Sequence, residues 1–78
     1  MTLVSMKKEL AEELVDLKLQ QIIEYINEIL ATWNYRSAEN LIKDTRDGKL
    51  SEAEDDAITL TNLLDNRDEL INLKRSWS

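Results

Sequence analysis

The chain contains no proline and a single glycine among its 78 residues, and this shortage of turn-forming residues limits the folds open to it. All-β proteins place a tight turn between each pair of strands, and glycine and proline dominate those turns. Helices need far fewer such residues. Apolar residues also recur at steps of three and four through residues 5–33. The sequence therefore predicts an all-α fold of one domain, a small helical bundle.

Residues 5–33 hold no strong breaker, which predicts one long helix. A short helix is predicted over residues 38–47, because Ser37 is a favourable N-cap. Gly48 is expected to end this helix in a left-handed conformation, and the apolar Leu50 follows two residues later to close the turn.

Ser51 and Glu54 have the spacing of a capping box, which predicts a third helix over residues 51–74. Asn66 and Glu69 repeat that spacing, so a kink or a new start near residue 66 remains an alternative. Residues 75–78 are expected to form a tail.

The long N-terminal segment carries apolar residues on two different faces. At 100° per residue the two sets are displaced by roughly 160° on a straight helix. Either the chain bends near Asp16, or one unbroken helix uses its two halves against different neighbours. We favour the unbroken helix, because no glycine, proline or capping residue marks a stop there. The first set is Leu3, Met6, Leu10, Leu14 and Leu17, and the second is Val15, Leu19, Ile22, Ile23, Ile26, Ile29, Leu30 and Trp33.

An unbroken first helix implies an oligomer. It would extend about 43 Å, whereas a compact monomer of this length is only ~30 Å across. Exposed leucines on the protruding part would be stable only beneath a second chain, so we expect a homodimer. The face expected to form the core or the dimer contact comprises Leu10, Leu14, Leu17, Leu19, Ile22, Ile26, Ile29, Trp33, Leu60 and Leu64. Trp77 lies beyond the last periodic residue and is either part of a disordered tail or an anchor for a partner.

The chain has no cysteine and no histidine, which removes disulfides, thiol nucleophiles, imidazole bases and zinc sites built on nitrogen or sulfur. Residues 43–54 resemble a calcium-binding EF-hand loop when Gly48 occupies the invariant glycine position. Lys43 and Thr45 stand where the first two ligands belong, however, and a lysine opposes a divalent cation. Capping roles for Gly48 and Ser51 explain the same residues. We therefore expect no metal, cofactor or small-molecule ligand.

The formal net charge of −6 argues against nucleic acid as a partner, because phosphate backbones repel an acidic surface. A helix-turn-helix reader is disfavoured for the same reason, since its recognition helix would begin with the acidic run of residues 52–56. These acidic residues, like those at 12–16 and 65–69, are interpreted as solvated helix faces. The sequence also contains no apolar stretch long enough to cross a bilayer and no secretory signal, which predicts a cytoplasmic protein.

These observations favour a non-enzymatic interaction or regulatory protein that acts as a helical homodimer. The alternative is an acidic inhibitor, comparable to an antitoxin, that blocks the basic site of a nucleic-acid enzyme.

Overall fold

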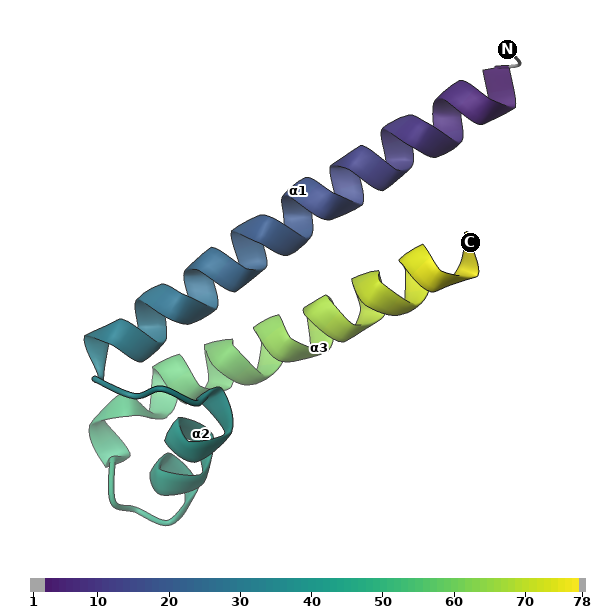
Figure 1. The fold of residues 1–78 in the computed structure, drawn as a ribbon. Helices are drawn as coiled ribbons and strands as arrows, with labels where there is room; N and C mark the ends of the chain where they lie inside the picture. The colour runs from purple at the N-terminus through teal and green to yellow at the C-terminus, as the bar shows by residue number, and fades with distance from the viewer. Residues whose placement is uncertain (1–2, 78) are drawn as a thin grey trace.

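The computed structural model describes residues 3–77, which form three α-helices and one 3₁₀ turn. The helices are α1 (Leu3–Thr32), α2 (Ala38–Arg46) and α3 (Glu54–Ser76), and the 3₁₀ turn η1 (Ser51–Ala53) leads directly into α3. No strand occurs among the described residues, which confirms the all-α prediction. Helices α1 and α3 run in opposite directions, and α2 lies at the end remote from both termini (Figure 1).

Helices α1 and α3 are each continuous. Helix α1 passes through Asp16 without a break, so its two apolar faces belong to one helix. Helix α3 likewise passes through Asn66, so no new helix starts there. It ends at Ser76, two residues beyond the end predicted from the sequence, with Trp77 at its C-cap.

The start of α3 differs from the capping box expected at Ser51 and Glu54. Ser51 lies inside the 3₁₀ turn, where its backbone carbonyl accepts a hydrogen bond from the Glu54 N–H. The N-cap of α3 is Ala53, which has no side chain able to cap the helix. A capping box requires the serine to precede the helix in an extended conformation. Ser51 is the first residue of η1, so it does not precede the helical segment as a capping box requires.

Two turns of the same construction end α1 and α2. At Asn34 (φ 59°) the amide donates to the Ala31 carbonyl at 3.2 Å, and the next amide, that of Tyr35, donates to Leu30 at 2.8 Å. This pattern is the Schellman motif, in which a left-handed residue satisfies the last carbonyls of a helix.

The predicted stop at Gly48 (φ 83°) follows the same motif. The Gly48 amide donates to Thr45 at 3.2 Å, and the Lys49 amide donates to Asp44 at 2.9 Å. Ser37 caps the start of α2 as expected, since its hydroxyl oxygen accepts from the Asn40 amide.

The hydrophobic core lies at the end of the hairpin where α2 covers α1 and α3. Leu41 of α2 and Leu60 of α3 are completely buried at its centre. No described polar side chain is buried. The other buried residues of this cluster are Ile22, Ile26, Ile29, Leu30, Ala53 and Ala57.

Two hydrogen bonds fasten the loops to this core. The Trp33 indole nitrogen donates to the Asp56 carboxylate at 2.7 Å, which ties the end of α1 to the start of α3. The Tyr35 hydroxyl donates to the Asp44 carboxylate at 2.6 Å, which ties the first loop to α2. Both rings also pack against the core cluster. They therefore act as lids of the helical bundle, as expected for aromatic residues at a helix end.

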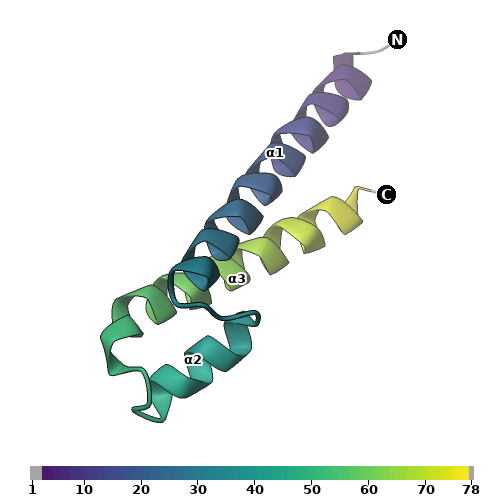
Figure 2. The ribbon, with the colours of Figure 1, turned by 60° about the vertical axis from the view of Figure 1, so that its left-hand side comes forward.

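The molecule is long and narrow because α2 covers only part of the hairpin. Its dimensions are 56 × 19 × 17 Å, and its radius of gyration of 16.1 Å exceeds the about 11.5 Å of a compact chain of this length. Toward the termini α1 and α3 diverge, and the N-terminal end of α1 extends beyond α3 (Figures 1 and 2).

The turn at Gly48 provides a direct test of the fold. A Cβ atom there would meet no atom within 4 Å, so a substitution costs only the strain of its positive φ. We expect Gly48→Ala to lower the free energy of unfolding by about 1 kcal/mol. Gly48→Asn should cost less, because Asn34 already adopts this conformation in the same motif. Urea denaturation measures both changes, and a Gly48→Ala variant as stable as the unmodified chain would contradict this account.

The Tyr35–Asp44 contact predicts a pH dependence. The hydrogen bond to Asp44, together with partial burial and repulsion by the Asp44 charge, raises the pKa of the Tyr35 phenol. The stabilisation is therefore complete below the ordinary tyrosine pKa and is lost as the pH rises through the raised one. In a Tyr25→Phe background, absorbance titration should place the Tyr35 midpoint above 10, and Asp44→Asn should lower it. Identical midpoints with and without Asp44 would refute the assignment.

Candidate functional site

Among the side chains that the structure describes, three leucines on α1 form the largest regular group of exposed apolar residues. Leu10, Leu14 and Leu17 keep 58%, 59% and 57% of their surfaces accessible, and we call them the leucine stripe. Their spacing of four and then three residues places them on one side of the helix. Leu3 and Met6 continue the spacing in the sequence, but their side chains lie outside the described part of the structure.

The leucine stripe faces away from the rest of the molecule. The opposite face of α1 packs against α3, and Val15, Ile22 and Ile26 are buried there. The ten residues expected to form the core or dimer face thus separate into two groups. Ile22, Ile26, Ile29 and Leu60 are buried, Leu19, Trp33 and Leu64 are partly buried, and the leucine stripe has no cover within the described chain.

A hollow of about 330 Å³ borders the leucine stripe, lined by Glu13, Asp16, Leu17 and Gln20. It is a shallow surface depression between neighbouring side chains of one helix. Its walls are two carboxylates and an amide beside a leucine, and the Asp16 carboxylate is paired with Lys74. The depression therefore belongs to the surface of α1.

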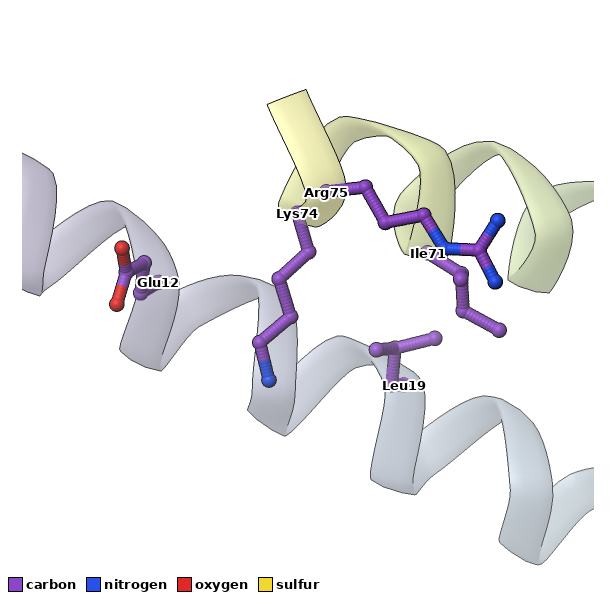
Figure 3. A pocket seen from close by; sticks show the side chains of 5 residues that line it. All are labelled: Glu12, Leu19, Ile71, Lys74 and Arg75. Atoms are coloured by element: carbon purple, nitrogen blue, oxygen red, sulfur yellow. The ribbon is translucent and has the colours of Figure 1, made fainter. Parts of the chain in front are cut away.

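A second hollow of about 380 Å³ lies where α1 and α3 diverge. Glu12 and Leu19 line it from α1, and Ile71, Lys74 and Arg75 line it from α3 (Figure 3). Lys74, which lines this hollow, donates a hydrogen bond from its ammonium group to the Asp16 carboxylate of α1. Both partners of this ion pair are about half exposed, so it contributes at most ~1 kcal/mol to stability. The hollow is open to solvent, and three of its five lining side chains are charged.

The acidic clusters are dispersed around their helices. No group of three or more acidic side chains in residues 3–77 is arranged to hold a metal ion. At the start of α3, Glu52, Glu54 and Asp55 are exposed, while Asp56 accepts the Trp33 hydrogen bond. In the loop that resembles an EF-hand, the Asp44 carboxylate is engaged by Tyr35.

Trp77 has a defined place at the end of α3. Its amide donates to the Lys74 carbonyl at 3.2 Å, and its side chain is partly buried. The interpretation of residues 75–78 as a tail is therefore wrong for Arg75 and Ser76, which are helical. A role for Trp77 as a partner anchor stays a prediction.

Sequence reasoning did not single out Tyr25, which is 51% exposed on α1. It lies eleven residues after Leu14, which is three helical turns, so it continues one edge of the leucine stripe toward the core end. This spacing was the signal that would have identified it.

None of the helices described here combines the length and the apolar composition needed to cross a bilayer. Comparison with known proteins adds no assignment, because no protein-family model, curated protein or solved structure matches the chain.

Proposed function

We propose that this protein is a non-enzymatic interaction or regulatory protein that acts as a helical homodimer through the leucine stripe of α1. The observation that carries the proposal is the exposure of Leu10, Leu14 and Leu17, each more than half accessible on one face of a continuous helix. Single exposed leucines are normal on protein surfaces, whereas a contiguous row is typical of a contact surface.

The energy available from the leucine stripe indicates a dimer that depends on concentration. Burying a leucine fully contributes roughly 1.5–3 kcal/mol, and about half of that remains available at each of these positions. Six leucines from two copies then offer roughly 5–9 kcal/mol. Association itself costs at least ~4 kcal/mol. The surplus is modest, so a dilution series is the informative measurement.

We expect light scattering to show a dimeric mass at high protein concentration and dissociation on dilution. Replacing the leucine stripe by Leu10→Gln, Leu14→Gln and Leu17→Gln should give a monomer at concentrations where the unmodified chain is dimeric. Ile58→Gln is the matched control, because Ile58 is 56% exposed on α3. It should leave the mass unchanged.

Two outcomes would reject the homodimer. The first is a monomeric mass at every concentration, and the second is a triple variant that dimerises as strongly as the unmodified chain. Far-ultraviolet circular dichroism of the triple variant checks that its helices are intact, since the stripe lies outside the core.

A second candidate function is an acidic inhibitor of a nucleic-acid enzyme. It is favoured by the net charge of −6 and by the exposed carboxylates of Glu52, Glu54 and Asp55 at the start of α3. Binding to a basic protein partner should then weaken steeply with salt and fall after Glu52→Gln, Glu54→Gln and Asp55→Asn. Capture of neutral or acidic partners only, without salt dependence, would remove this candidate.

A further inference from the structure

We infer that the leucine stripe is covered by a second copy of α1 that lies parallel to the first and in register with it. This inference rests on the proposed homodimer and adds its geometry. It is carried by the positions of two exposed charges, Glu13 and Lys18, on opposite edges of the stripe.

The spacing of the leucine stripe is that of a coiled-coil contact. Leu10, Leu14 and Leu17 occupy successive d, a and d positions of a seven-residue repeat, and Gln21 follows at the next a position. Counting in the same repeat places Glu13 at a g position and Lys18 at an e position. These are the two positions that flank the contact between paired helices and set their orientation.

Glu13 and Lys18 cannot satisfy each other within one helix. Five residues separate them, which places them roughly 140° apart around the axis, with the leucine stripe between them. Both side chains are exposed, and within residues 3–77 neither takes part in an ion pair. Each charge is therefore available to a partner that approaches over the leucines.

Orientation decides which charges meet. In a parallel pair the g edge of one helix faces the e edge of the other, so Glu13 lies beside Lys18 of the partner subunit, five positions further along. The two-fold symmetry repeats this contact on the other side. In an antiparallel pair centred on the leucine stripe, Glu13 lies beside Glu13 of the partner subunit, whereas the two Lys18 residues lie about 12 Å apart along the axis. The Glu13–Lys18 contacts favour the parallel arrangement, and the facing Glu13 residues disfavour the antiparallel one. Lys7, at the a position before Leu10, opposes the parallel arrangement because it would meet its own copy there.

The fold leaves room for this arrangement. Helix α3 packs on the opposite face of α1, where Val15 and Ile22 are buried, so a second α1 displaces nothing. Helix α2 lies near the C-terminal end of α1, away from the half that carries the leucine stripe (Figures 1 and 2). The dimer would place the two α1 helices at its centre and one α3 on each outer side.

The absence of cysteine allows a direct test by disulfide formation. In the parallel pair residue 21 of one copy faces residue 21 of the other, within the ~7 Å that a disulfide spans between Cα atoms. In an antiparallel pair centred on the leucine stripe these positions lie about 20 Å apart along the axis. We expect Gln21→Cys to form a covalent dimer under mild oxidation, whereas the exposed Asn62→Cys on α3 should remain largely uncrosslinked.

Charge exchange provides an independent readout. Lys18→Glu should weaken the dimer roughly threefold to tenfold at low salt, because it places two carboxylates side by side in each pair. The combined Glu13→Lys and Lys18→Glu variant should restore the original affinity. Sedimentation or light scattering over a dilution series measures both changes.

The outcomes separate the two proposals. A monomer at every concentration rejects the homodimer, and the parallel arrangement falls with it. A dimer in which Gln21→Cys crosslinks no more than Asn62→Cys, or which Lys18→Glu strengthens, rejects the parallel arrangement and leaves the homodimer standing.

Discussion

The burial of Leu41 and Leu60 in one apolar cluster is the constraint on which the rest of the structure depends. Both side chains are completely buried where α2, α1 and α3 meet, and each contributes roughly 2–3 kcal/mol by leaving water. Helix α2 spans only about 14 Å, however, whereas α1 spans about 45 Å and α3 about 35 Å. A three-helix core therefore exists only at one end of the hairpin. Everything beyond the reach of α2 is a two-helix structure that cannot cover both faces of α1.

This limit explains why α1 has two apolar faces. The face with Ile22 and Ile26 finds cover inside the chain, first from α2 and α3 and then from α3 alone. The face with Leu14 finds none. A helix that only had to complete its own bundle would carry polar residues at positions 10, 14 and 17, as it does at Gln21 and Glu24 further along. On this side of α1 the leucines end at Leu17 and polar residues begin at Gln21. The contact with a second chain is therefore expected to end near Gln21.

Much of the fold was predictable because the local signals agree with the tertiary structure. The scarcity of breakers, the Ser37 cap and the glycine at residue 48 each act through the nearest few residues, and the structure uses all three as predicted. Asn34 carries the same left-handed signal as Gly48 in a weaker form, because asparagine adopts this conformation less readily than glycine. The capping box at Ser51 failed because η1 placed that residue inside a turn.

The candidate site was less predictable for a different reason. Periodicity shows that Leu17 and Leu19 lie on different faces, but it does not say which face α3 will take. In the structure Leu41 of α2 shares one buried cluster with Ile22, Ile26, Ile29 and Leu30, so this face of α1 is the one that the chain covers. Only the assembled hairpin identifies Leu10, Leu14 and Leu17 as the face left open.

A parallel dimer would also relate the two candidate functions to each other. Because the copies point the same way, both α2 ends and both starts of α3 lie at one end of the assembly. The exposed carboxylates of Glu52, Glu54 and Asp55 are then doubled at that end, while the other end carries the two N-terminal segments of α1. An antiparallel dimer would instead divide the carboxylates between opposite ends. The orientation set by Glu13 and Lys18 thus determines whether the two sets of carboxylates face a basic partner together at one end or separately at opposite ends.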